Sequence, residues 1–304
     1  MSNVPNHTSV TFIQGDVKDA DFMESLFTRY QFDYVYHLAD FSAVALSHFV
    51  RSYNYRNNLV GSAEVINAAV KAKVDCFVFT SSASVYGTEQ TPLVETVVPE
   101  PKDPYGIAKY AVELDLKAAH HMWDMDYVIF RPDNVYGPRQ NVFDIHRNVI
   151  GIFMNQILSN KPLTVFGDGK QTRAFAYIDD VAPIIARGPL VKAARNEVFN
   201  VGVDRVYTLN GIAREVSSAM GAAPNVQHLE ARKEAKHAVS DHSKLRCFFD
   251  TPPPVSLKDG LRAMADWVHK KDKINATEKF EAVEVLEGMP PALVGPDKPM
   301  KEQA

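Results

Sequence analysis

The sequence is poor in cysteine and has no long apolar segment, and both absences narrow the function. Only two of the 304 residues are cysteine, Cys76 and Cys247, and their spacing fits neither a metal site nor a CxxC redox motif. We therefore expect no bound metal, no disulfide framework, and the cytoplasm or another reducing compartment. No stretch is long and apolar enough to cross a bilayer, and the start, MSNVPNHTSV, lacks the basic and apolar regions of a signal peptide.

An excess of charge of either sign is also lacking. The 33 Lys and Arg residues nearly balance the 37 Asp and Glu residues, which gives a formal net charge of −4. Such a chain has no general attraction for nucleic acid or for an anionic membrane, so we expect neither as a partner. With 46% hydrophobic residues, the chain can still bury a sizeable core, as an ordinary globular protein does.

Short apolar runs alternate with amphipathic segments of helical length, which indicates an α/β fold with a doubly wound parallel sheet. Runs rich in Val, Ile, Phe and Tyr predict buried strands, whereas apolar positions at helical spacing predict helices. The predicted strands lie at residues 10–13, 33–38, 76–82 and 127–132. The predicted helices lie at residues 19–30, 58–73, 104–123, 149–160, 208–221 and 255–271.

Three residues near the end of a predicted strand and the start of the long helix that follows could carry out acid–base chemistry. A YxxxK pattern places Tyr105 and Lys109 one turn apart on the same helix face. An ammonium group near a phenol favours the phenolate, so the tyrosine can act as a base near neutral pH. Ser82 lies at the carboxyl end of a strand, where open α/β sheets bind ligands, and can bridge a substrate alcohol and the tyrosine. The YxxxK pattern alone also fits a solvated lysine beside a half-buried tyrosine.

Several longer motifs follow one another between about Ser9 and Lys270. They are GDV, HLAD, NNLVG, SSASVYG, PYGIAK, RPDNVYGPRQ, VFGDGKQTRAFAYIDDVA, VFNVG and VSLKDGL. On these motifs the sequence resembles the extended short-chain dehydrogenase/reductase family, in particular its NAD-dependent nucleotide-sugar epimerases and dehydratases. The resemblance implies a Rossmann-like sheet with a smaller α/β substrate-binding lobe, NAD as cofactor and a nucleotide-diphosphate sugar as substrate. It also implies a homodimer or a place in a larger complex.

The resemblance further assigns roles to individual residues. Ser82, Tyr105 and Lys109 would form the catalytic set, with Lys109 also holding the nicotinamide ribose. Ala83 and Ser84 lack the carboxylate that dehydratases and decarboxylases of the family present before VYG, which favours epimerisation at C4 through a 4-keto intermediate. The cofactor-binding residues would be Asp16, Val17, Leu38, Ala39, Asn58, Tyr105 and Lys109, with Asn58 at a helix start. The substrate-binding residues would be Ser82, Asn134, Arg173 and Lys236.

The family's glycine-rich phosphate loop has no counterpart in this sequence. Only fourteen residues precede Gly15, and none of them is glycine, so the first two strands, the GxxGxxG loop and the first helix are missing. The first strand is central in a sheet of this type, so the strand predicted at residues 10–13 would lack a neighbour. We expect that another chain supplies the missing piece, that the sequence is truncated, or that the sheet is rearranged.

Two functions therefore stay open at the level of sequence. The intact Ser82, Tyr105 and Lys109 set favours an active NAD-dependent 4-epimerase. The missing glycine loop, and Asp40 where the family usually has a small residue, favour a non-catalytic subunit or scaffold of a larger assembly. We expect an N-terminally incomplete NAD-binding domain at residues 1–138 and a mostly substrate-binding lobe at 139–270, with returns to the main domain. Residues 271–304 are polar and Pro-rich, which predicts a loosely ordered extension.

Overall fold

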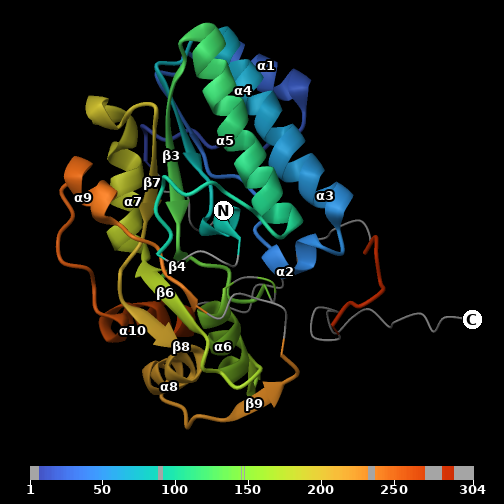
Figure 1. Cartoon of the computed structure of the whole chain (residues 1–304), viewed down its shortest axis with the longest axis vertical. Coiled ribbons are helices and arrows are strands. Elements are labelled where there is room, and N and C mark those ends of the chain that lie inside the picture. Colours follow the sequence, from blue (N-terminus) through green and yellow to red (C-terminus); the bar gives the residue numbers. More distant parts are fainter. Residues whose placement is uncertain are drawn as a thin grey trace, which may run out of the picture.

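The computed structural model describes residues 7–87, 92–144, 146, 148–231, 237–270 and 283–290. Figure 1 shows a larger part, in which helices flank a sheet, and a smaller part at the other end of the molecule. The sheet of the larger part is entirely parallel, in the order β1-β2-β3-β7, which confirms the predicted α/β class. Its strands are β1 (Tyr34–His37), β2 (Cys76–Thr80), β3 (Asp126–Pro132) and β7 (Glu197–Val201).

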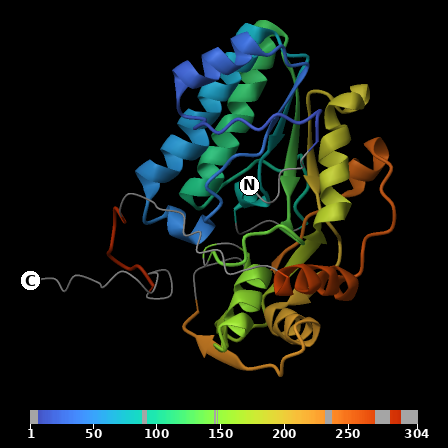
Figure 2. The same cartoon turned by 180° about the vertical axis from the view of Figure 1, so that it is seen from behind.

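Both faces of this sheet are covered by helices, as Figures 1 and 2 show, which explains the continuous apolar runs of its strands. In β2, Phe77 and Phe79 belong to the core on one face, whereas Cys76 and Val78 belong to the core on the other. One layer contains α1 (Ala20–Arg29), α4 (Gly61–Ala72) and α5 (Pro104–Trp123), and the other contains α7 (Ile178–Arg187) and α9 (Ser243–Phe248).

The strand predicted at residues 10–13 is wrong. This segment runs as irregular chain, with Val10, Phe12 and Ile13 exposed by 43%, 50% and 40%. In the described part of the chain, β1 is an edge strand, so the segment has no neighbour with which to exchange backbone hydrogen bonds. The predicted pattern resumes at Asp19, whose carboxylate accepts a hydrogen bond from the Phe22 N–H (2.9 Å) and caps α1.

The helix before β2 begins earlier than the sequence indicated. It does not start at Asn58 but runs from α3 (Arg51–Tyr55) through a π-helical turn (Arg56–Val60) into α4. Figure 1 shows α3 and α4 as one long rod beside α5. Single π turns inside α-helices are often found at functional sites, and this one faces the ligand edge of the sheet described below.

The smaller part combines short strands with three of the predicted helices. A second sheet has the order β10-β6-β4, with β8 antiparallel to β6, and β5 pairs separately with β9. Their common core joins Tyr136, Phe153, Phe175 and Tyr177 to aliphatic residues of the helices. These elements are β4 (Asn134–Tyr136), α6 (Val149–Leu158), β5 (Leu163–Phe166), β6 (Thr172–Tyr177), β8 (Val206–Thr208), α8 (Leu209–Ala219), β9 (Val226–Leu229), β10 (His237–Ala238) and α10 (Leu257–His269).

A described segment of the C-terminal extension, residues 283–290, lies against α3. The Glu284 carboxylate accepts hydrogen bonds from the N–H groups of Ser52 (2.8 Å) and Tyr53 (2.9 Å), at the start of that helix. Met289 packs against the small apolar cluster that contains Phe41. The rest of the extension lies outside the described residues.

The described helices include none that is long and apolar enough to cross a membrane. The remaining short elements are α2 (Val44–Ser47) and the 3₁₀ turns Ala83–Tyr86, Gly188–Leu190 and Lys192–Ala194.

Candidate active site

The carboxyl ends of β1 and β2 and the first turns of α5 meet at one edge of the sheet, where they bring the predicted catalytic residues together. Ser82 is the second residue after β2, and its hydroxyl accepts a hydrogen bond from the Ser84 N–H (3.1 Å). Asp103 caps α5 through a bond from the Gly106 N–H (2.8 Å) and so fixes its first turn. Tyr105 lies in that turn and is buried, and the Ser82 hydroxyl favours the ionised form of its phenol by lowering the pKa of Tyr105.

Lys109 lies one turn further along α5 and is only 1% exposed. Its ammonium group donates a hydrogen bond to the carbonyl of Thr80 (2.8 Å) and forms an ion pair with Asp40 Oδ2 (2.9 Å). It also lies 4.9 Å from the centre of the Phe79 ring. The alternative of a solvated lysine is therefore wrong, because this cation is desolvated and held by specific partners.

Asp40 holds the tyrosine as well as the lysine. The Tyr105 hydroxyl donates a hydrogen bond to Asp40 Oδ2 (3.1 Å), the same oxygen that pairs with Lys109. Burial raises the pKa of Tyr105 well above its ordinary value, and the Asp40 carboxylate raises it further, while the Ser82 hydroxyl acts in the opposite direction. In this arrangement the phenol stays protonated and acts as a hydrogen-bond donor.

His37, at the end of β1, is a buried and uncharged imidazole near Asp40 and Lys109. Burial lowers its pKa to about 4, and the positive charge of Lys109 contributes in the same direction. The Ser62 hydroxyl donates to the Asn58 carbonyl (2.7 Å), so it accepts a hydrogen bond from His37 Nε2 (2.9 Å). This bond fixes the tautomer with the proton on Nε2.

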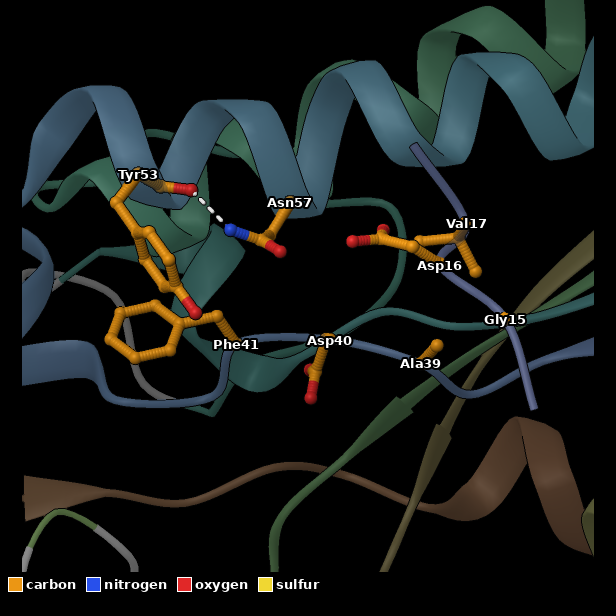
Figure 3. A pocket seen from close by; sticks show the side chains of 8 residues that line it. All are labelled: Gly15, Asp16, Val17, Ala39, Asp40, Phe41, Tyr53 and Asn57. Carbon is orange, nitrogen blue, oxygen red and sulfur yellow. Dashed lines mark hydrogen bonds between the residues drawn. The ribbon is translucent and has the colours of Figure 1, made fainter. Parts of the chain in front are cut away.

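A cavity of about 330 Å³ lies beside the predicted catalytic residues, between the chain that precedes α1, the loop after β1 and the helix α3 with its π turn (Figure 3). Three of the predicted cofactor residues, Asp16, Val17 and Ala39, line it. Leu38 does not, and its side chain is 53% exposed. The lining residues are Gly15, Asp16, Val17, Ala39, Asp40, Phe41, Tyr53 and Asn57.

Asn58 is buried and supports the wall of the cavity without lining it. Its side-chain oxygen accepts a hydrogen bond from the Phe41 N–H (2.7 Å), and its Nδ2 donates to the Phe41 carbonyl (2.9 Å). These two bonds fix the loop that carries Asp40. The preceding residue, Asn57, lines the cavity instead and donates to the Tyr53 carbonyl (2.7 Å), as Figure 3 shows.

Two predicted substrate-binding residues lie on neighbouring strands of the second sheet. Asn134 begins β4 and donates a hydrogen bond to the carbonyl of Ala174 on β6 (3.1 Å). Arg173 lies next to Ala174, and its guanidinium group donates to the Thr172 carbonyl (2.8 Å). The fold therefore places both side chains at one end of the lobe. Lys236 lies outside the described residues.

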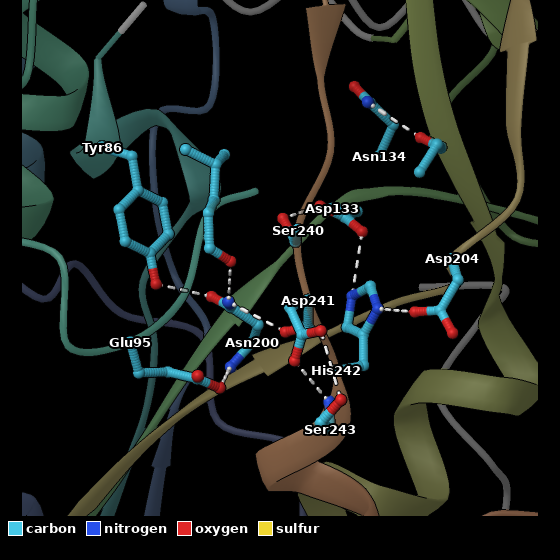
Figure 4. A network of polar contacts seen from close by, with 12 residues as sticks. Tyr86, Glu95, Asp133, Asn134, Asn200, Asp204, Ser240, Asp241, His242 and Ser243 are labelled. Carbon is cyan, nitrogen blue, oxygen red and sulfur yellow. Dashed lines mark hydrogen bonds and ion pairs between the residues drawn. The ribbon is translucent and has the colours of Figure 1, made fainter. Parts of the chain in front are cut away.

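A polar network around the buried His242, which the sequence did not reveal, lies between Asn134 and the loop after β2 (Figure 4). His242 is enclosed by two carboxylates, with 3.1 Å from Nε2 to Asp133 and 2.8 Å from Nδ1 to Asp204. Burial opposes a charge on this ring, but the two carboxylates outweigh it and raise the pKa of His242. In the same network, the Tyr86 hydroxyl donates to Asn200 (2.8 Å) and ties the turn after Ser82 to β7.

Comparisons with known proteins show the family of the chain. The sequence profile described as the NAD dependent epimerase/dehydratase family matches residues 2–202. The chain belongs to this family. A UDP-glucose 4-epimerase of Mycolicibacterium smegmatis is 28% identical, with 90% of this chain and 87% of that protein covered. A dTDP-D-glucose 4,6-dehydratase of Mus musculus is also 28% identical, over 95% of this chain and 82% of the relative.

A solved structure of the family supports the fold in particular. The Thermus thermophilus UDP-glucose 4-epimerase, solved in complex with NAD, superimposes with a TM-score of 0.80 at 28% identity. The match covers 88% of this chain and 87% of the other. Relatives of both the epimerase and the dehydratase type are thus similar to this chain. By resemblance the chain is an enzyme of this family, and the relatives do not distinguish between the two reactions.

The cavity of this family member meets only part of what binding of NAD would require. Asp16 and Val17, which the resemblance predicts to meet adenine, line the cavity, whereas Tyr105 and Lys109, predicted near the nicotinamide ribose, contact it only through Asp40. Asp40 also places a carboxylate on the cavity wall, and glycine occurs only once among the lining residues. No group of three His, Cys, Asp or Glu side chains in the described chain is arranged to hold a metal ion.

A second buried pair anchors the helix α5, which carries Tyr105 and Lys109, to the sheet. Glu113 follows Tyr105 and Lys109 at the same spacing of four residues, and it is fully buried. It accepts two hydrogen bonds from Arg131 of β3, at 2.9 Å and 2.6 Å, and one from the Ser81 hydroxyl. The i, i+4, i+8 spacing was a visible signal in the sequence, but nothing local pointed to Arg131 as the partner.

Proposed function

We propose that this family member epimerises a nucleotide-diphosphate sugar at C4 in an NAD-dependent reaction. The observation that carries the proposal is the convergence of Ser82, Tyr105 and Lys109 at the carboxyl edge of the sheet, beside the cavity. Ala83 and Ser84 support epimerisation over dehydration, because neither can act as the acid or base that eliminates water.

The residues divide the proton chemistry between them. Ser82 orients the C4 hydroxyl of the sugar toward Tyr105, which takes its proton when the phenol is ionised. The Lys109 ammonium group stabilises the resulting phenolate through its charge. NAD, when bound, would accept the C4 hydride and return it, which yields the opposite configuration after the 4-keto sugar has turned in the site. Tyr105 then returns the proton to the C4 oxygen, so that protons and electrons balance.

Asn134 and Arg173 would orient the diphosphate of the substrate. A guanidinium group is suited to this task because its donors match phosphate oxygens. Both residues are located on adjacent strands of the smaller part, away from the Ser82 group. A substrate bound between the two parts would therefore present its sugar to Tyr105 and its phosphates to the lobe.

One observation favours a second candidate function, a non-catalytic subunit of a larger assembly. Asp40 forms bonds with both Tyr105 and Lys109, and these are the groups that catalysis and cofactor binding require. A protein kept only for its surface would tolerate such a contact, whereas an active enzyme must break it in each binding event.

Product analysis separates these functions. The purified chain is incubated with saturating NAD and a panel of UDP- and dTDP-hexoses, some deuterated at C4, and the products are resolved by chromatography and mass spectrometry. The proposal predicts the C4 epimer with the deuterium retained. A 4-keto-6-deoxy product would assign the chain to the dehydratases, and no product with any sugar, even with NAD bound, would favour the non-catalytic subunit.

A further inference from the structure

The contact between Asp40 and the catalytic pair has a consequence for how the site is loaded. We propose that Asp40 is an internal competitor of the cofactor: its carboxylate binds the same ammonium and hydroxyl groups that the nicotinamide ribose needs, and must release them when a dinucleotide binds. This inference rests on the proposed NAD dependence. It makes Asp40 a residue that sets cofactor affinity and the protonation of Tyr105, without a chemical step of its own.

The geometry places Asp40 between the cavity and the catalytic pair. It lines the cavity, and one of its oxygens lies 2.9 Å from Lys109 Nζ and 3.1 Å from the Tyr105 hydroxyl. The side chain of Asp40 is 19% exposed, whereas that of Lys109 is only 2% exposed. Asp40 is therefore the one of the three with access to a ligand in the cavity, and Lys109 reaches that ligand only past the carboxylate.

The backbone on either side of Asp40 is held firmly, so the loop as a whole does not need to move. Asn58 binds both the N–H and the carbonyl of Phe41, the residue directly after Asp40. On the other side, the His37 carbonyl accepts a hydrogen bond from the Thr80 hydroxyl (3.3 Å). A rotation of the Asp40 side chain is thus the smallest change that frees Lys109, because the ammonium group keeps its bond to the Thr80 carbonyl.

The negative charge of Asp40 disfavours binding of the cofactor. A pyrophosphate is negatively charged, and a carboxylate on the same cavity wall repels it at short range. While Asp40 stays in place, its charge offsets that of Lys109, and the phenol remains a donor. The other titratable groups around Tyr105 are Asp103, whose charge also disfavours the phenolate, and His37, which is neutral near pH 7 because burial lowers its pKa to about 4.

The test uses Asp40→Asn, which removes the charge at constant size, and Asp40→Ala, which also removes the hydrogen bonds. Asp266→Asn is the matched control, because Asp266 is an exposed carboxylate of α10. Two quantities are measured: the affinity for NAD by calorimetry, and the ionisation of Tyr105 from ultraviolet difference spectra between each variant and the same variant carrying Tyr105→Phe. Thermal unfolding of each variant verifies that it is folded.

We expect both Asp40 variants to bind NAD about tenfold more tightly than the unchanged chain, since one repulsive charge is gone. We also expect Tyr105 to ionise at least about one pH unit lower, which is a tenfold shift in its equilibrium. Asp266→Asn should change neither quantity. NAD binding with both quantities unmoved in folded Asp40→Asn and Asp40→Ala would overturn the inference. Another outcome is that Tyr105 ionises at a lower pH in the Asp40 variants while neither these variants nor the unchanged chain binds NAD. This result would support the contact between Asp40 and Tyr105 but contradict the proposed function.

Discussion

The ion pair between Glu113 and Arg131 gives a direct test of how the helix α5 is held against the sheet. Both side chains are at most 2% exposed, and two short hydrogen bonds join them. Burial alone would lower the pKa of Arg131, but the bonds and charge of Glu113 outweigh it and raise that pKa. Glu113→Gln keeps the size of the side chain but removes its charge, so it leaves a buried guanidinium group without a counter-ion.

Breaking a buried pair in this way costs about 3–5 kcal/mol, which is a large share of a typical stability of roughly 5–15 kcal/mol. Urea unfolding followed by circular dichroism and by fluorescence measures the loss. The double variant Glu113→Leu/Arg131→Met removes both charges. Its free energy of unfolding should be close to that of the unchanged chain, because well-packed apolar residues can replace such a pair. A loss below about 1 kcal/mol in Glu113→Gln, within the range of a surface pair, would refute the reasoning.

Three further predictions concern groups around the site. The pKa of His37 is lowered to about 4 in the folded chain, from an ordinary value of 6.5, so stability should rise between these pH values by about 3 kcal/mol. His37→Gln should remove this slope in unfolding curves measured across pH. The pKa of His242 is raised, so its stabilisation should be fully present below pH 6.5 and be lost as pH rises through the folded value, and His242→Asn should flatten that region. Glu284→Gln should weaken the cap of α3 by about 1 kcal/mol, seen as a lower melting temperature and as faster proteolysis of the extension, whereas an unchanged melting temperature would argue against the docked segment.

The parts of the fold that depend on short-range pattern were predictable. The strands around Phe77 and Ile129 follow from continuous apolar runs, since a parallel sheet buries both of its faces. The position of Tyr105 and Lys109 on one face follows from helical spacing. The cap at Asp103 and the end of α8 near Gly221, with its φ of +66°, follow from the same kind of local rule.

Contacts between distant segments were not predictable in this way. Residues 10–13 have the composition of a strand, but a strand needs a partner, and that depends on the whole sheet. Asn57 and Asn58 are identical neighbours, and the contact of the second with the distant Phe41 decides that it is buried while the first lines the cavity. His242 meets Asp133 and Asp204 from separate segments, and no spacing between them signals the cluster.

Asp40 lies between these two cases. Its identity was visible as an unusual residue in HLAD, but the sequence did not show which groups it would contact. Sixty-five residues separate it from Tyr105, and the hydrogen bond between them forms because β1 and α5 end at the same edge of the sheet. The sequence therefore predicted the candidate pair Tyr105 and Lys109 and showed an unusual residue at Asp40, and the structure shows the contacts between them.

The central claim is that the Tyr105 phenol moves the proton of a sugar hydroxyl at this site. The most direct measurement compares the unchanged chain with Tyr105→Phe, both saturated with NAD, in the interconversion of the C4 epimers of a UDP-hexose. We predict a loss of about 100-fold or more in turnover, as expected for a missing general acid–base group, with an unchanged circular dichroism spectrum. Equal turnover in the two proteins would contradict the account.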